Sequence, residues 1–225
     1  RYGLVGSEMC IRDRSRVAKN AGISGKREIL TAFGADVKGY KGKDTHVDLF
    51  VGSELAPRFF GWGIPTGPDE GRIGIATTLP HKPMSFFRDY FSKGAPSKFL
   101  GGAKIINLIS GLIPFGVASP SYTDNIILTG DAAGMAKPTS GGGIYSGLIS
   151  ADAAFEVASK ALNSGDLSSV NLSEYQTLIV NRIGGELTKG SYLRKAFLSL
   201  NDDQLAEIIS TVSYTHLRAH ETVSH

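Results

Sequence analysis

The stretch that decides the fold is Asn125-Ile-Ile-Leu-Thr-Gly-Asp-Ala-Ala-Gly-Met-Ala-Lys-Pro-Thr-Ser-Gly-Gly-Gly-Ile-Tyr-Ser-Gly147. The nearly continuous apolar run at 125–129 predicts a strand buried on both faces. Asp131 follows it, and a carboxylate at the end of a buried strand is costly unless something uses it. The glycines at 141–143 then begin a helix, whose first N–H groups are unpaired and lie at the positive end of its dipole. A glycine-rich turn in which Asp131 caps the helix is the simpler alternative.

Two amphipathic helices follow this stretch. The first is predicted to bury one stripe of residues spaced four, three, four, three and four apart, namely Ile144, Leu148, Ala151, Phe155, Ala158 and Leu162. Asn163-Ser-Gly165 ends it. The second helix is predicted to bury Leu172, Tyr175, Ile179, Ile183 and Leu187, and a third helical segment at 202–210 comes last.

The residues before the stretch favour an antiparallel sheet. A short helix is expected to end at Gly22, and strands are expected at 28–34, 47–52, 59–64 and 72–78. Turn-forming residues at 65–71 predict a hairpin between the last two strands. Such a sheet can cover a ligand with one face. Residues 83–92 are predicted to be helical, with aromatic side chains at Phe86, Phe87, Tyr90 and Phe91.

Composition excludes several classes of protein. The chain has 41% hydrophobic and 20% charged residues, and its net charge of +3 is too small to indicate a nucleic-acid partner. The single cysteine, Cys10, and the isolated histidines give no ligand spacing, so we expect no metal site. No apolar run approaches the ~20 residues that span a bilayer. Lys189, Arg194 and Lys195 are better explained by a solvated helix face than by a phosphate site.

Both ends of the chain resemble translated sequencing adapter. The two stretches are residues 6–14 and 212–222, so we treat 1–14 and 212–225 as adapter-like artefact. The natural material is then expected to be 15–211, a piece of a longer protein.

Gly130-Asp-Ala-Ala-Gly-x-x-x-Pro-x-x-Gly-Gly-Gly-Ile144 resembles the second FAD motif of the p-hydroxybenzoate-hydroxylase-like flavoproteins, and within them the geranylgeranyl reductases. Ala56-Pro-Arg-Phe-Phe-Gly-Trp-Gly-Ile-Pro65 resembles their aromatic motif, with Phe60 and Ile64 where tyrosine and phenylalanine are usual. Gly165-Asp-Leu-Ser, Tyr175 and Gly185-Glu-Leu are also similar to the family's C-terminal helices. The resemblance extends from residue 15 to about residue 210.

The resemblance implies an α/β fold of the p-hydroxybenzoate-hydroxylase type. An α+β substrate sheet would accompany a partial, Rossmann-like FAD-binding domain that is truncated at its N-terminus. The expected parts are a remnant of the FAD domain at 15–25, the substrate-binding sheet at 26–118, the second FAD motif and its helix at 119–164, and C-terminal helices at 165–211.

The family also implies a set of site residues. Asp131 would bind the ribityl chain of FAD, and the backbone of Gly143 and Ile144 would hold the pyrimidine side of the flavin ring. The expected cofactor-binding residues are Gly130, Asp131, Ala132, Pro138, Gly141, Gly142, Gly143 and Ile144. Residues expected to line the substrate cavity are Phe59, Phe60, Trp62 and Pro65, for which packing within the sheet core is an equal alternative.

The implied reaction is reduction of C=C bonds in geranylgeranyl chains of archaeal-type membrane glycerophospholipids, by hydride from reduced flavin. NAD(P)H or ferredoxin would supply the electrons, and no residue is identified as the proton donor. Such an enzyme is expected in the cytoplasm, peripheral at the membrane, with Phe86, Phe87, Tyr90 and Phe91 touching the bilayer. The alternatives are a geranylgeranyl diphosphate or chlorophyll-type reductase, an aromatic-ring FAD monooxygenase, and a non-catalytic fragment without the first FAD motif.

Overall fold

The computed structural model describes residues 15–23, 27–78, 81, 83–89 and 93–221, and for residues 16 and 212–221 it describes the backbone alone. The chain forms two compact units. The helical unit comprises Arg1–Thr31 and Gly111–Lys195, and the sheet unit comprises Ala32–Ser110 and Ala196–His225.

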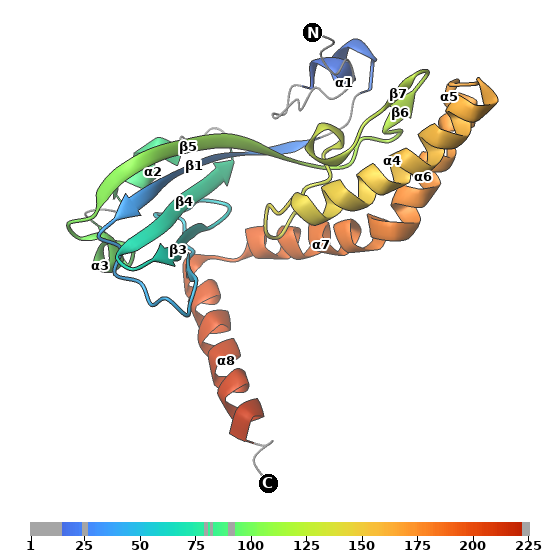
Figure 1. The fold of residues 1–225 in the computed structure, drawn as a ribbon. Coiled ribbons are helices and arrows are strands. Elements are labelled where there is room, and N and C mark those ends of the chain that lie inside the picture. Colours follow the sequence, from blue (N-terminus) through green and yellow to red (C-terminus); the bar gives the residue numbers. More distant parts are fainter. Residues whose placement is uncertain (1–14, 24–26, 79–80, 82, 90–92, 222–225) are drawn as a thin grey trace. The chain divides into compact units, whose positions relative to one another are not determined.

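A five-stranded sheet in the order β2-β3-β4-β1-β5 forms the centre of the sheet unit (Figure 1). Its strands are β1 (Glu28–Lys38), β2 (Asp48–Phe50), β3 (Gly61–Gly67), β4 (Glu70–Thr78) and β5 (Lys104–Phe115). The β2–β3 and β3–β4 pairs are antiparallel, so the predicted sheet and hairpin are confirmed. Pairing of β3 with β4 continues to Gly67 and Glu70, and the loop is shorter than expected because Asp69 adopts a left-handed φ of 62°.

Two short helices, α2 (Pro83–Asp89) and α3 (Ser97–Leu100), cover one face of this sheet. The predicted helix at 83–92 is confirmed as far as Asp89, and residues 90–92 lie outside the described chain, with Tyr90 and Phe91 among them. Phe87 is buried in the core, so its predicted contact with a bilayer is wrong for this structure. The core consists of Ala35, Val37, Tyr40, Phe50, Ala56, Ile73, Ile75, Phe87 and Leu100.

The helical unit begins with α1 (Arg16–Asn20), whose N-cap is the predicted helical residue Ser15. Its later elements are the β6 (Tyr122–Thr123) and β7 (Ile126–Ile127) hairpin, the 3₁₀ turn η1 (Gly130–Ala133), α4 (Ile144–Ser164), α5 (Ser169–Leu172), α6 (Glu174–Ile179), the π-helix η2 (Val180–Gly184) and α7 (Gly185–Ser199). α8 (Asp202–Glu221) belongs to the sheet unit. None of the helices in the described ranges has both the length and the apolar character needed to cross a membrane.

The second predicted stripe forms the core of the helical unit. All five of its residues, which are distributed over α5, α6, η2 and α7, are buried, so the stripe is confirmed. They pack against α4 and the β6–β7 hairpin (Figure 1). The members of the stripe are Leu172, Tyr175, Ile179, Ile183 and Leu187.

The predicted buried stripe of α4 is wrong, although the helix itself and its end at Gly165 are confirmed. The large residues of that stripe are exposed, and the opposite face is buried instead. Small side chains on the buried face let α4 lie close to α6. Two of them are serines, and each hydroxyl donates to a backbone carbonyl three residues earlier, which lowers the cost of burial. The buried residues are Ser146, Ser150, Ala153, Val157 and Ala161.

The strand predicted at 125–129 is also wrong in extent and burial. Only Ile126–Ile127 form β7, which pairs with β6 and is half-buried. The chain reverses at Asp124 and Asn125, where Asn125 adopts a left-handed φ of 62°. Asparagine tolerates this conformation better than most residues, so a turn replaces the start of the predicted strand.

Arg194 on α7 is buried, so the solvated face predicted there is wrong for this residue. Its Nε and one terminal nitrogen contact the two carboxylate oxygens of Glu28 at 2.9 and 2.5 Å. The guanidinium also lies 5.1 Å from the centre of the Phe115 ring. Because a bidentate ion pair satisfies the buried charge, Arg194 serves to join α7 to β1. Lys189 and Lys195 are exposed, as expected.

We expect Tyr175→Phe to lower the free energy of unfolding by about 1–3 kcal/mol, because it leaves a buried carbonyl without its donor. In the native chain the Tyr175 hydroxyl donates to the Leu128 carbonyl oxygen at 2.7 Å. The matched control, Tyr192→Phe, removes the hydroxyl of an exposed tyrosine and should change stability by less than about 0.5 kcal/mol. Urea denaturation followed by circular dichroism measures both. Equal effects of the two substitutions would contradict this role of Tyr175.

Candidate functional site

Glycines shape the loop that the sequence singled out. The chain enters η1 at Gly130, with a φ of 51°, and leaves it at Gly134, with a φ of 72°. A Cβ on Gly134 would collide with the carbonyl oxygen of Gly116, so any side chain there is excluded by both conformation and space. These two turns direct the backbone out of the β6–β7 hairpin and towards the start of α4.

Two buried hydroxyl groups fix the entrance to this loop. Ser150 of α4 accepts a hydrogen bond from the Gly130 N–H at 3.0 Å, and Tyr175 of α6 donates to the Leu128 carbonyl at 2.7 Å. Burial raises the pKa of Tyr175, so its hydroxyl stays protonated and remains a donor. Because buried backbone groups without partners are costly, these bonds determine where the chain turns into Asp131.

Asp131 lies against the first residues of α4. A Cβ built on Gly143 would be only 2.7 Å from Oδ1 of Asp131. Gly143 is the N-cap residue of the helix, and Ile144 is its first residue. Asp131 and Gly143, which the resemblance assigns to one cofactor, therefore lie side by side. Only glycine at position 143 leaves room for the carboxylate where it stands.

The environment of Asp131 disfavours its charge. The side chain reaches the surface, but partial burial raises the pKa of Asp131 above its ordinary value. No hydrogen bond from the part of the chain that the structure describes offsets this desolvation. Asp131 therefore does not cap α4, and its oxygens can accept hydrogen bonds from a ligand, which would favour the charged form.

The middle of the loop is held in place by Lys137. Its N–H donates to the Gly142 carbonyl at 2.9 Å, and its own carbonyl accepts from the Gly141 N–H at 2.8 Å. The Lys137 ammonium is paired with Glu186 at 2.5 Å and lies 4.8 Å from the centre of the Tyr145 ring. Backbone and side chain together hold the three glycines before α4 in a defined arrangement.

All the predicted cofactor-binding residues lie in this one loop, and their binding roles stay predictions. Pro138 is buried, and it packs so closely on Gly190 of α7 that a Cβ there would be 3.2 Å from the proline Cδ. The other members are at least partly accessible: Gly130, Asp131, Ala132, Gly141, Gly142, Gly143 and Ile144.

Three of the four predicted substrate residues form an aromatic row in the sheet unit. Trp62 of β3 lies opposite Gly74 of β4, and its indole ring occupies the space that a side chain at Gly74 would need. The Phe60 ring is 6.3 Å from Trp62, and Phe59 stacks on Phe60 at 4.3 Å. Phe59 is buried, whereas Phe60 and Trp62 are half-buried and keep part of their apolar surface accessible.

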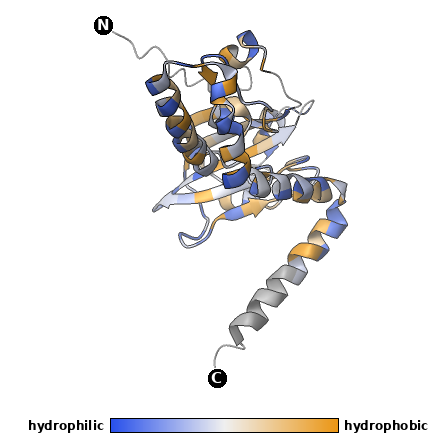
Figure 2. Ribbon diagram, turned by 90° about the vertical axis from the view of Figure 1, so that its right-hand side faces the viewer, coloured by the Kyte–Doolittle hydropathy of each residue, from blue (hydrophilic) through white to orange (hydrophobic). Residues whose placement is uncertain are grey.

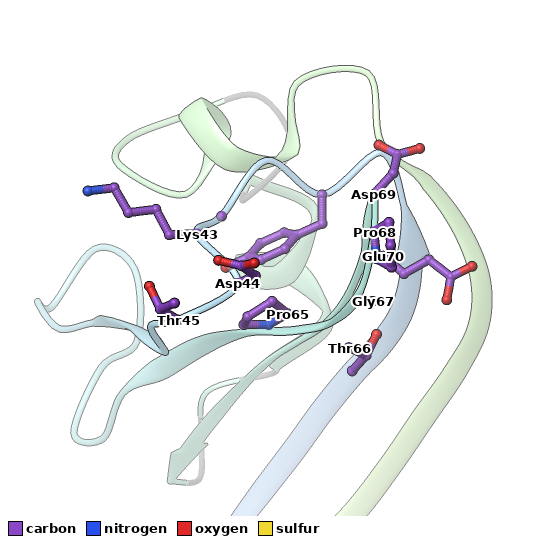
Figure 3. Close-up of a pocket in the computed structure, with 11 residues that line it drawn as sticks. Lys43, Asp44, Thr45, Pro65, Thr66, Gly67, Pro68, Asp69 and Glu70 are labelled. Atoms are coloured by element: carbon purple, nitrogen blue, oxygen red, sulfur yellow. The ribbon is translucent and has the colours of Figure 1, made fainter.

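Pro65 lies on the other face of β3 from Trp62, because side chains alternate along a strand. With Tyr40 it lines a hollow of about 700 Å³. The Tyr40 hydroxyl donates to Asp48 at 2.7 Å, and burial together with this carboxylate raises the pKa of Tyr40. Figure 3 shows Lys43, Asp44 and Thr45 on one side of the hollow and Asp69 and Glu70 on the other. Its polar lining differs from the apolar setting expected for an isoprenoid chain.

The residues that fix the loop were not identified from the sequence. Tyr175 was assigned to a buried stripe and to the family resemblance but to no specific contact, although a buried tyrosine hydroxyl needs a hydrogen-bond partner. Ser150 gave no such signal, because it falls outside the apolar spacing of its helix.

No protein-family model matches the chain, and comparison with curated proteins gives several relatives. An uncharacterized protein of Methanocaldococcus jannaschii is 34% identical over 193 residues, which cover 85% of this chain and 48% of that protein. A digeranylgeranylglycerophospholipid reductase of Methanospirillum hungatei is 32% identical over 185 residues, covering 80% of this chain and 46% of the reductase. The chain thus spans about half the length of the curated relatives it matches.

Solved structures give the same fold. A geranylgeranyl bacteriochlorophyll reductase-like protein of Thermoplasma acidophilum superposes with a TM-score of 0.76 at 24% identity, covering 83% of this chain and 47% of that one. For p-nitrophenol 4-monooxygenase of Pseudomonas putida the TM-score is 0.57 at 16% identity, with 87% of this chain and 51% of that one covered. The predicted p-hydroxybenzoate-hydroxylase-like α/β fold is confirmed. With named lipid reductases among its relatives, the predicted resemblance of the chain to the geranylgeranyl reductase family is confirmed.

Proposed function

We propose that the protein of which this chain is part uses FAD to reduce C=C bonds in geranylgeranyl chains of archaeal-type membrane glycerophospholipids. The observation that carries the proposal is the Asp131 carboxylate beside Gly143, at the start of α4. Named reductases among the relatives support the substrate class. Two further neighbours in fold, named as a flavin-dependent brominase and a flavin-dependent halogenase, support the type of cofactor.

The residues of the loop fit a flavin. Asp131 can accept a hydrogen bond from a ribityl hydroxyl, because its oxygens have no donor among the described residues. The N–H groups of Gly143 and Ile144 lie at the positive end of α4, where developing negative charge on the pyrimidine side is stabilised. The remaining residues, whose small or fixed side chains keep the loop open to a ligand, are Gly130, Ala132, Pro138, Gly141 and Gly142.

When bound, the reduced flavin would supply hydride to one carbon of the double bond. The chain's contribution would be to orient the cofactor and to stabilise its charge. Ser150 and Tyr175 hold the backbone that presents Asp131, and Lys137 holds the glycines that present the helix start. No proton donor is assigned.

The aromatic row at the start of β3 would supply an apolar surface for the substrate. Phe60 and Trp62 keep accessible ring area, and Phe59 supports Phe60 from the core. An isoprenoid chain has methyl branches and no hydrogen-bonding groups, so it would bind such a surface through apolar contact alone. Pro65, on the opposite face of β3, is not part of this surface. NAD(P)H or ferredoxin would reduce the flavin, and the protein would work in the cytoplasm at the membrane surface.

Asp131→Asn should weaken FAD binding by roughly tenfold while leaving the flavin-free protein equally or more stable. The raised pKa of Asp131 means that ionisation of its carboxyl group lowers the stability of the folded state, and asparagine removes that charge. The carboxylate is ionised above its raised pKa, so wild-type affinity should fall as pH decreases through that pKa, whereas the variant should show little dependence. Quenching of flavin fluorescence measures affinity, and Asp152→Asn on the outer side of α4 is the control. Equal affinity and pH dependence in all three proteins would refute the ribityl contact.

Gly143→Ala should also weaken FAD binding, because the added methyl group displaces the Asp131 carboxylate. Its matched control is Gly147→Ala in the same helix, where an added Cβ meets nothing within 4 Å. The control should retain FAD and stabilise the fold by about 0.5–1 kcal/mol, since alanine favours a helix over glycine. Bound FAD per protein and the urea midpoint test both changes. If the two variants bind FAD equally, the close approach of Asp131 and Gly143 has no role in binding.

The reaction itself is tested with the complete gene product that contains this chain. The purified protein should be yellow and, after chemical reduction without oxygen, should add two hydrogens per double bond to digeranylgeranylglycerophospholipid, as measured by mass spectrometry. Phe60→Ala and Trp62→Ala should raise KM more than they lower kcat. Unreduced lipid together with phenol-stimulated oxygen uptake would replace this proposal with a monooxygenase.

A further inference from the structure

Arg72 of β4 is held in place by side chains from two neighbouring strands. Its Nε donates to Oδ1 of Asp36 on β1 at 2.8 Å, and the amide nitrogen of Asn107 on β5 donates to Oδ2 of Asp36 at 3.5 Å. The hydrogen bond from Arg72 keeps the pKa of Asp36 below its ordinary value, so this carboxylate is charged at neutral pH. Three adjacent strands thus fix the direction of one guanidinium group, whose side chain is 54% exposed.

This polar cluster lies on the face of the sheet opposite to α2 and α3. Ile73 of β4 is buried in the same core as Phe87 of α2, so alternation along the strand places Arg72 and Gly74 on the other face. The strands drawn in Figure 2 carry both hydrophobic and hydrophilic residues. Trp62 is paired with Gly74, and its indole ring lies over that glycine. Arg72 and the aromatic row therefore share one face of the sheet.

Along this face, Arg72 follows directly after the aromatic row. Ile64, which comes two residues after Trp62 on β3, is paired with Arg72 on β4. Residues two apart on a strand are separated by about 7 Å, so the position of Arg72 is one such step beyond the indole. The face thus changes from accessible aromatic rings to a cation over a short distance, as an amphipathic ligand requires.

The guanidinium keeps hydrogen-bonding capacity for a ligand. Asp36 uses the Nε of Arg72, and the two terminal nitrogens have no partner among the residues that the structure describes. Arginine presents its N–H groups in a planar fork that matches two oxygens of a phosphate group. Because exposed ion pairs add little to stability, the sheet does not need Arg72 to be oriented in this way.

Charges of both signs surround Arg72. Lys38 follows Asp36 by two residues on β1, and Glu70 precedes Arg72 by two residues on β4, and both are exposed. Since these charges offset one another, the long-range attraction of an anion is small here. Recognition would come from directed hydrogen bonds of the guanidinium, together with apolar contact further along the face.

We propose that Arg72 binds the phosphate group of the lipid substrate and thereby sets the direction in which the isoprenoid chain lies on the aromatic row. This inference rests on the proposed function, which supplies a ligand with a phosphate group and long apolar chains. With the phosphate at Arg72, the first isoprene units would lie against Ile64 and Trp62, and later units against Phe60. Asp36 is a positioning residue, because it acts through Arg72.

Binding of geranyl phosphate and of geraniol, which lacks the phosphate, tests this assignment in the 225-residue chain. Trp62 is the single tryptophan, so its fluorescence reports a ligand on the aromatic row. Geranyl phosphate should bind roughly tenfold more tightly than geraniol. Arg72→Gln should remove this preference without changing the affinity for geraniol. Arg72→Lys, which keeps the charge but not the fork, should retain part of the preference. The matched control, Arg88→Gln at an exposed position of α2, should retain all of it.

Equal affinities of the wild-type chain for the two ligands would overturn the proposal. So would an equal loss of affinity for both ligands in Arg72→Gln, because that result shows a structural role. Inorganic phosphate should compete with geranyl phosphate only weakly, and tight competition would assign Arg72 to a free phosphate ion instead. In the complete gene product, Arg72→Gln should raise KM for the phospholipid several-fold while kcat stays unchanged. The geranyl phosphate measurement needs neither flavin nor reduction, so its outcome is separate from that of the proposed function.

Discussion

The candidate site depends on the hydrogen bonds that hold the backbone between Leu128 and Gly130. Ser150 and Tyr175 reach this segment from two helices that form the core of the helical unit. Without these hydroxyls, a carbonyl and an N–H would be buried unpaired, and the chain could enter the following turn at another angle. Residues that never contact a ligand thus set the direction in which the Asp131 carboxylate points.

The cost of this arrangement falls on Asp131 itself. Its partial burial against the start of α4 disfavours the charged form, and the flanking glycines contribute no side-chain donors. Such a local conflict between folding and charge is common where a protein prepares a binding site, because the ligand later supplies the missing interaction. The same loop is otherwise firmly held, with Lys137 bonded at its backbone and paired at its ammonium.

The sequence predicted the positions of helices and strands better than it predicted which of their sides are buried and which distant residues they contact. Glycine and proline positions located the β3–β4 hairpin and the end of α4, because they act through local backbone conformation. The burial of α4 was predicted on the wrong side, since periodicity identifies an apolar stripe but not which of two apolar sides meets the core of the described chain. Asn125 was predicted to begin a strand because a strongly apolar run follows it. Its left-handed φ places it in a turn instead. The closeness of Asp131 and Gly143 followed from a motif, whereas the roles of Ser150 and Tyr175 depend on contacts between distant segments.

The π-helix η2 determines which side of α7 packs into the core of the helical unit. Tyr175, Ile179, Ile183 and Leu187 are four residues apart, and in an uninterrupted α-helix each such step would advance the side chain by about 40° beyond a full turn. Accumulated over three steps, that drift would carry Leu187 to a different side of the helix from Tyr175. The wider turn at Val180–Gly184 absorbs the drift and keeps all four residues on one side. Loss of a single residue there would rotate α7 by about 100° and swing Arg194 away from Glu28, so chain length in this turn is under as strong a constraint as any side chain.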